Sequence, residues 1–258
     1  MVGENIFNVD PLQTGGIPPE SVVKQLLQWM KGYPMCLYCP GDVHRVSKPN
    51  IKRLVEEELP SFLGADVVRL HHGAREGTFT VLFALYKYHI LNRKDKAPIV
   101  IIDGNTHYSM ILATERVMLE CVLTRVSDEP EYRVIEEDFA NKIEEAKSKY
   151  GKEPLAIIVN YPDGKYTNIP NLKRIVKIAR EYDVYVIVDG AYAIGRMPFN
   201  MKEEGVDVAI GSAHKSMACI GPLGVIGMTE DIAKIVLKKS VELSILIEYA
   251  YENEHKRV

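Results

Sequence analysis

The sequence predicts an α/β protein with three layers (α/β/α), in which a mostly parallel sheet lies between helices. From about residue 66 onward, short β-rich runs alternate with longer helical patterns, which is typical of βαβ crossovers. The expected strands consist almost entirely of Val, Ile and Leu, as is usual when helices cover both faces of a sheet. The 258 residues are 47% hydrophobic and 26% charged. These ordinary globular values exclude a disordered, collagen-like or coiled-coil chain.

Each expected element is placed by its pattern. Short β-rich runs of strand length cover 66–70, 98–102, 118–125, 155–159, 184–188, 206–210 and 223–228. Longer stretches of helical pattern separate them, at 74–90, 107–117, 135–150, 171–182 and 230–239. None of the apolar runs is long enough to span a membrane.

Residues 1–65 differ from the rest. They contain several Pro and Gly residues, then a helix pattern at 21–30 and a loop at 32–42. We interpret them as an N-terminal arm that packs on a main domain formed by residues 66–240.

Charge and cysteine content narrow the class of protein. Lys plus Arg is 32 and Asp plus Glu is 35, which gives a net charge of −3 and no sign of bulk attraction to nucleic acid. The start of the chain does not resemble a signal peptide, so we expect a cytoplasmic protein without a membrane partner. In that reducing compartment the four cysteines are expected to be thiols.

Polar, often Gly-containing turns follow five of the expected strands. Because sites in open α/β sheets form at the carboxyl ends of strands, these turns should converge. They are 71–76, 103–108, 160–164, 189–192 and 211–216.

Four features of these turns indicate chemistry. Lys215 follows a buried strand, where partial desolvation favours a Schiff base, and Ser212 could donate to a phosphate. Asp189 ends an apolar strand, where a carboxylate needs a cation or a good donor, such as a pyridinium nitrogen. Arg75 lies at a helix start that suits a phosphate, and His107 could stack on an aromatic ring.

Each feature also has an ordinary structural interpretation: a solvated lysine, a strand-end carboxylate, a common helix start, a capping histidine. Together, however, they describe a site for pyridoxal 5′-phosphate (PLP). The chain contains neither a G-x-G-x-x-G fingerprint nor a Walker A loop.

The chain resembles the O-phosphoseryl-tRNA:Cys-tRNA synthase family, archaeal PLP-dependent enzymes of fold type I. The matching motifs occur in order over roughly residues 5–240. They are Asp10–Gln13 with Gly15-Gly16, Cys36–Cys39, His72–Glu76, His107-Tyr108, Asp163–Tyr166, Ala191-Tyr192 with Gly195–Pro198, and His214–Ala218.

The resemblance implies a role for each site residue. Lys215 would bind the cofactor covalently, His107 would stack on its ring, and Asp189 would face the pyridine nitrogen. Further cofactor-binding residues would be Ala74, Arg75, Ser212, Ala213 and His214. The family usually carries Asn where this chain has Asp189, and His where it has Asn160.

The resemblance also implies the reaction and the partners. Phosphate of O-phosphoseryl-tRNA(Cys) would be replaced by sulfur to give cysteinyl-tRNA(Cys), which serves tRNA-dependent cysteine synthesis and protein biosynthesis. The partners would be this tRNA, a sulfur donor, phosphoseryl-tRNA synthetase and a second copy of the chain in a homodimer.

Cys36 and Cys39 are candidates for the sulfur step. A C-x-x-C pair lowers the pKa of one thiol and brings a second within reach, so it could carry a persulfide or bind part of an iron–sulfur cluster. Two unrelated loop cysteines are the alternative. A zinc site needs more ligands than His44 could add, and we expect no metal site. Cys121 and Cys219 lie in apolar contexts and are expected in the core.

The C-terminal part departs from the family. Residues 241–258 form a divergent tail, and neither the third functional cysteine nor the small C-terminal domain is found in the sequence. Two other functions therefore stay open: another PLP-dependent sulfur enzyme of the cysteine desulfurase or lyase type, and a truncated, non-catalytic paralogue.

Overall fold

The computed structural model describes residues 17–30, 51–92 and 95–238. Cys36, Cys39, the loop at 32–42 and the tail at 241–258 lie outside the described residues. Within the described residues, no helix is long and apolar enough to cross a membrane.

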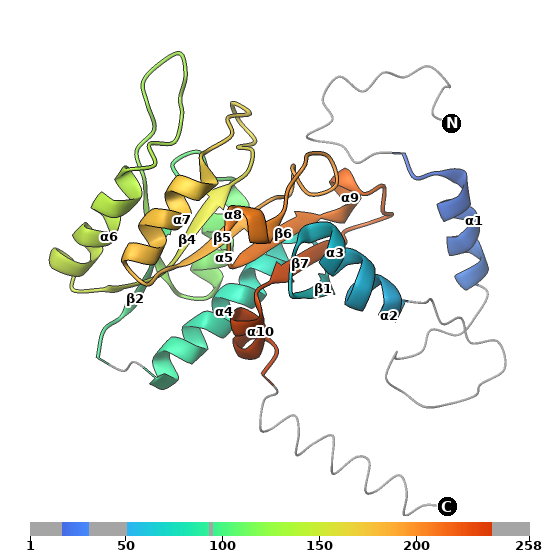
Figure 1. Ribbon diagram of the computed structural model, residues 1–258, viewed down its shortest axis with the longest axis horizontal. Helices are drawn as coiled ribbons and strands as arrows, with labels where there is room; N and C mark the ends of the chain where they lie inside the picture. Colours follow the sequence, from blue (N-terminus) through green and yellow to red (C-terminus); the bar gives the residue numbers. More distant parts are fainter. Residues whose placement is uncertain (1–16, 31–50, 93–94, 239–258) are drawn as a thin grey trace, which may run out of the picture.

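A seven-stranded sheet forms the centre of the molecule (Figure 1). Its strands are β1 (Val67–His71), β2 (Pro98–Ile102), β3 (Glu120–Leu123), β4 (Glu153–Asn160), β5 (Tyr185–Asp189), β6 (Val208–Ser212) and β7 (Gly224–Met228). The order across the sheet is β1-β7-β6-β5-β4-β2-β3. The predicted α/β fold with a mostly parallel sheet is confirmed.

Only β7 runs against its neighbours. It pairs antiparallel with both β1 and β6, whereas the other neighbouring strands are parallel. Six strands therefore end at the same edge of the sheet, where β7 begins.

Helices cover both faces of the sheet. The larger ones are α4 (Ala74–Asn92), α5 (Tyr108–Arg116), α6 (Asp138–Ser148), α7 (Leu172–Glu181) and α10 (Glu230–Val236). A further helix, α1 (Glu20–Trp29), has no buried residue among those described. The shorter ones are α2 (Ile51–Arg53), η1 (Leu54–Glu58), α3 (Leu59–Leu63), α8 (Met201–Glu204) and α9 (Ala213–Ser216).

Side chains that alternate along each strand build two cores, one on each face. Ile157 belongs to the core that also contains residues of α3, α6 and α7, whereas its neighbour Ile158 belongs to the core that contains residues of α4, α5 and α10. This alternation explains why the strand sequences are continuously apolar rather than amphipathic.

Several predicted boundaries move. The strand expected at 118–125 shortens to β3, because Met118 takes a left-handed conformation (φ +60°) before it. The helix expected at 135–150 starts only at Asp138, because Val134 pairs with Val126 in an isolated bridge. The sequence pattern did not predict the helical segment 51–63 that the structure shows. Leu63 at its end is 1% exposed and belongs to the core.

Candidate active site

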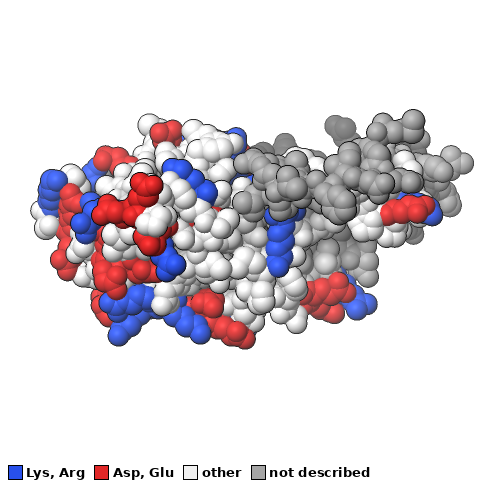
Figure 2. Space-filling model, turned by 90° about the horizontal axis from the view of Figure 1, so that it is seen from above, with Lys and Arg blue, Asp and Glu red and all other residues white. Residues whose placement is uncertain are grey.

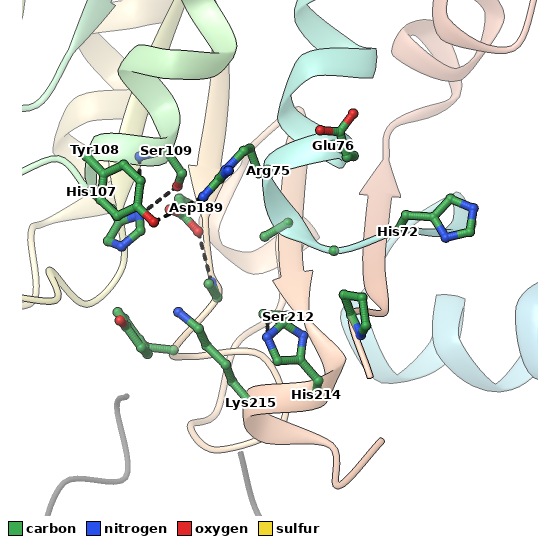
Figure 3. A pocket seen from close by; sticks show the side chains of 15 residues that line it. His72, Arg75, Glu76, His107, Tyr108, Ser109, Asp189, Ser212, His214 and Lys215 are labelled. Atoms are coloured by element: carbon green, nitrogen blue, oxygen red, sulfur yellow. Dashed lines mark hydrogen bonds between the residues drawn. The ribbon is translucent and has the colours of Figure 1, made fainter. Parts of the chain in front are cut away.

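A cavity of about 460 Å³ opens at the edge where six strands end (Figure 3). It brings together Lys215, Asp189, His107, Arg75, Ala74, Ser212 and His214, all of which the sequence analysis assigned to one site. The remaining lining residues are His72, Gly73, Glu76, Tyr108, Ser109, Ala191, Tyr192 and Pro222.

Two predicted contributions lie elsewhere. The side chain of Ala213 packs in the core, and its N–H donates to the carbonyl of Leu223 (2.8 Å). The turn after β4 does not line the cavity. Its Asp163 instead accepts hydrogen bonds from backbone N–H groups of its own loop.

The start of α4 forms one end of the cavity. Gly73 precedes the helix with φ +91°, a conformation that strongly favours glycine. A Cβ on Gly224 would lie 2.7 Å from the Gly73 carbonyl carbon, so β7 passes this turn at a distance that only glycine permits. The first N–H groups of α4 have no partner within the helix, and together with the helix dipole they suit an anion.

Arg75 points from this helix start toward α5. Its Nη2 donates to the Tyr108 hydroxyl (3.0 Å), and its guanidinium lies 5.5 Å from the centre of the Tyr108 ring. Ser212 Oγ, at the end of β6, and His214 Nδ1, on α9, are 3.1 Å apart. Positive charge and hydroxyl groups thus surround this end of the cavity.

His107 is a flat, uncharged ring on the wall. It caps α5, and its Nδ1 accepts from the Ser109 N–H (3.3 Å) and lies 2.6 Å from Ser109 Oγ. Burial, followed by the positive charges of Lys215 and Arg75, lowers the pKa of His107. The neutral ring therefore carries its proton on Nε2.

Asp189 is the buried acid of the site. It ends β5, is 4% exposed, and accepts from the Ala191 N–H (3.1 Å). Burial raises its pKa to about 6, although this hydrogen bond and the charge of Lys215 act in the opposite direction. A bound cation in the cavity would stabilise the ionised carboxylate.

Lys215 lies on α9, directly after β6. Its Nζ is 4.2 Å from the centre of the Tyr192 ring, and Figure 3 shows the side chain pointing into the space beside His107 and Asp189. The backbone of α9 is fixed, because Arg196 Nη2 donates to the Lys215 carbonyl (2.5 Å).

Sequence reasoning did not assign Tyr108 and Tyr192 to the cavity wall. Tyr108 directly follows the predicted site residue His107. Tyr192 is the last residue of the predicted turn 189–192, which begins with Asp189. Their position in the predicted turns was the available signal.

Comparisons with known proteins show which family the sequence resembles. Residues 73–256 match the family model of O-phosphoseryl-tRNA(Sec) selenium transferase, SepSecS. O-phospho-L-seryl-tRNA:Cys-tRNA synthase 2 of Methanococcoides burtonii is 41% identical over 240 residues, which are 92% of this chain and 60% of the relative. The synthase of Methanosarcina acetivorans is 41% identical over 235 residues, with 91% and 59% covered. The chain thus spans about 60% of the length of the curated relatives it matches.

Solved structures show the same fold. A crystal structure of the complex between SepCysS and the SepCysE N-terminal domain superposes with a TM-score of 0.80 at 31% identity, covering 94% of this chain and 60% of that one. The cysteine desulfurase of Thermococcus onnurineus NA1 gives a TM-score of 0.63 at 21% identity, with 88% and 54% covered. The second likeness concerns the fold alone.

Proposed function

Because this chain belongs to the O-phosphoseryl-tRNA(Sec) selenium transferase family, we propose that it binds PLP beside Lys215 and converts O-phosphoseryl-tRNA(Cys) into cysteinyl-tRNA(Cys). The observation that carries the proposal is the buried carboxylate of Asp189 in the same cavity as the amine of Lys215. The relatives of similar sequence are named for this reaction.

The residues present fit the chemical groups of PLP. The start of α4, with Arg75, Ser212 and His214, suits the phosphate, and the neutral ring of His107 suits the flat pyridine face. Asp189 would pair with a protonated ring nitrogen, which explains how a carboxylate so deeply buried could remain charged. When bound, PLP supplies an electron sink for negative charge next to the substrate amine.

Different side chains of the protein would then bind the cofactor, orient it and transfer the proton. Lys215 would hold the cofactor through its Nζ and, as a free amine, would take the proton from the α-carbon of the phosphoseryl group. Asp189 would keep the ring nitrogen protonated. His107 would pack against the ring and exclude water from it. Arg75 and the N–H groups of α4 fix the phosphate end, so that the α-carbon stays within reach of the Lys215 Nζ.

Cys36 and Cys39 are the proposed carriers of sulfur. Their C-x-x-C spacing supports a low-pKa thiol that could hold a persulfide and a second thiol that releases it. A donor that carries sulfane sulfur would load one thiol as a persulfide. Attack by the second thiol would release sulfide to the substrate and leave a Cys36–Cys39 disulfide, which an external thiol reductant would reopen.

A second copy of the chain is proposed to cover α4 and α5. Large apolar side chains lie exposed on the outer side of α4 and α5: Phe83 is 50% exposed and Leu112 is 39% exposed. Exposed apolar side chains that lie together often mark a contact surface, so this face favours a homodimer. The face adjoins the cavity through Tyr108.

The other partners are proposed from the relatives. The similar structure is a complex of SepCysS with the SepCysE N-terminal domain, which supports assembly of this chain with a protein partner. Phosphoseryl-tRNA synthetase is the protein partner that the family resemblance implies. A cytoplasmic location would follow from a tRNA-bound substrate.

The test is cofactor uptake followed by turnover. The chain mixed with PLP should acquire a visible absorption band that Lys215→Ala loses and that Lys173→Ala, on the exposed surface of α7, retains. The loaded protein should then convert phosphoseryl-tRNA and sulfide into cysteinyl-tRNA. No uptake of PLP would support the non-catalytic alternative, and release of sulfur from free cysteine would support a desulfurase.

A further inference from the structure

A stacked pair of tyrosines lies on two loops that the proposed reaction leaves unused. Tyr132 is in the loop between β3 and α6, and Tyr166 is in the loop between β4 and α7. Their ring centres are 4.6 Å apart with the planes at 16°, and Lys165 Nζ lies 4.8 Å from the centre of the Tyr166 ring. Both rings are half-buried and Lys165 is exposed. We call these three residues the tyrosine platform.

The loop of Tyr166 is rigidly built. Asp163 is 2% exposed and accepts from the N–H groups of Lys165 (2.9 Å), Tyr166 (2.6 Å) and Asn168 (2.9 Å). Thr167, a β-branched residue, has φ +59°. Such a residue in the left-handed region is a backbone outlier that surrounding contacts must maintain.

The two loops are also joined to each other. Asn168 Nδ2 donates to the carbonyls of Glu131 (2.9 Å) and Tyr132 (3.2 Å). Tyr132 itself has φ +48°. The rings are therefore held in place by the protein before any ligand arrives.

The platform is connected to the cavity on both sides. Asn105, two residues before His107, donates from Nδ2 to the Tyr132 carbonyl (2.6 Å). On the other side, a Cβ on Gly164 would lie 2.7 Å from Tyr192 Cε2, and the Tyr192 ring adjoins Lys215. Both loops rise at the edge of the sheet that also carries α9 (Figure 1).

A flat aromatic surface beside a cation is suited to an unpaired nucleobase and its phosphate. Bases stack on aromatic rings without requiring one sequence. Tyr132 and Tyr166 cover one face of each other, and Lys165 Nζ lies over the Tyr166 ring. A base would therefore stack on Tyr166 by displacing the exposed side chain of Lys165, which could then pair with a backbone phosphate. On the face shown in Figure 2, Lys and Arg side chains alternate with Asp and Glu side chains over the described residues. Because no broad basic field is visible there, local stacking would have to contribute to RNA binding.

We infer that the tyrosine platform stacks an unpaired base of the 3′ end of the tRNA whose aminoacyl group enters the cavity, with Lys165 on a neighbouring phosphate. The inference rests on the proposed function, because it needs an RNA-linked substrate. Tyr132 and Tyr166 are binding residues that set the distance between the RNA end and Lys215.

Binding of unacylated tRNA(Cys) to the full chain, followed by fluorescence anisotropy, tests the inference. Tyr166→Leu should weaken binding about tenfold, as expected for the loss of one base–aromatic stack, whereas Tyr166→Phe should bind like the parent. Tyr150→Leu is the matched control. Tyr150 also carries a lysine near its ring (Lys149 Nζ, 4.9 Å), but it lies at the opposite edge of the sheet.

A second tRNA, shortened by its unpaired 3′ nucleotides, separates stacking from a general loss of structure. Parent and Tyr166→Leu should bind it equally. In addition, Lys165→Ala should reduce the slope of log Kd against log salt concentration by about 0.7 for the intact tRNA. This variant leaves the hydrogen bonds of Asp163 unchanged, since they come from backbone N–H groups.

Three results would overturn the inference: a parent chain that does not bind tRNA, equal binding of Tyr166→Leu and the parent, or an equal loss with the shortened tRNA. PLP uptake by Tyr166→Leu is measured in parallel. If Tyr166→Leu takes up PLP and binds tRNA as tightly as the parent, the role of the tyrosine platform is rejected but the proposed function is not. Absent uptake in the parent would reject the proposed function.

Discussion

Replacing Asp103 by Asn should change the pH dependence of stability. Asp103 follows β2 and is fully buried. Its Oδ2 accepts from the Asn160 N–H (2.5 Å), while its Oδ1 has no hydrogen-bond partner among the described residues. Burial raises the pKa of this carboxyl group to about 7, and the charges of Asp189 and Asp163 act in the same direction, against the hydrogen bonds from the Asn160 and Asn105 N–H groups.

The sign of the effect follows from proton binding. Between pH 4 and 7 the folded chain keeps a proton on Asp103 that the unfolded chain has released. The free energy of unfolding therefore falls as pH rises through this window. The difference between 3.8 and about 7, at 1.36 kcal/mol per pKa unit, corresponds to about 4 kcal/mol. An Asn side chain cannot ionise, so this fall in the free energy of unfolding does not occur in Asp103→Asn.

Urea denaturation of the cofactor-free chain at a series of pH values from 4 to 8 measures the effect. The stability of Asp103→Asn relative to the parent should rise with pH by up to about 4 kcal/mol. Asp138→Asn is the control, because its stability relative to the parent should fall, not rise, as pH increases. Burial alone would raise the pKa of Asp138, but hydrogen bonds from Arg125 and Asn141 hold it below its usual value. A relative stability of Asp103→Asn that does not vary with pH would refute the reasoning.

Three further substitutions test the scaffold of the site. Gly224→Ala should displace Gly73 and weaken PLP binding, because its Cβ would contact the Gly73 backbone at 2.7 Å; titration of the visible band measures the affinity. Arg180→Ala should destabilise the chain by about 2 kcal/mol in urea denaturation, since it removes two hydrogen bonds of 2.8 and 2.9 Å from Asp207, which keeps the one from the Val186 N–H. Leu82→Ala, at a fully buried position facing the sheet, should cost about 3 kcal/mol in the same assay, with unchanged PLP binding.

The apolar pattern of the sequence predicted the buried central strands well. The run at 98–102 became β2 with the same bounds, because five consecutive apolar residues suit only a strand covered on both faces. Asp189 and Lys215, 26 positions apart, reach one cavity as the rule for carboxyl ends of strands predicts.

Features that depend on packing could not be predicted in the same way. The position of β1 beside β7 requires a pairing between residues more than 150 positions apart, for which the sequence carries no local signal. The turn after β4 obeys the carboxyl-end rule but does not reach the cavity, because Asp163 closes its own loop. The exposure of the Tyr108 and Tyr192 rings in the cavity is likewise set by their neighbours.

The pairing of β1 with β7 also has a consequence for biosynthesis. While the polypeptide is emerging from the ribosome, the segment Val67–His71 cannot form its hydrogen bonds with Gly224–Met228 until those residues have been synthesised. Gly73, at the anion-binding turn, is set against Gly224 by the same pairing. A nascent chain could therefore form this turn and the cavity beside it only late in translation, once β7 has inserted between β1 and β6.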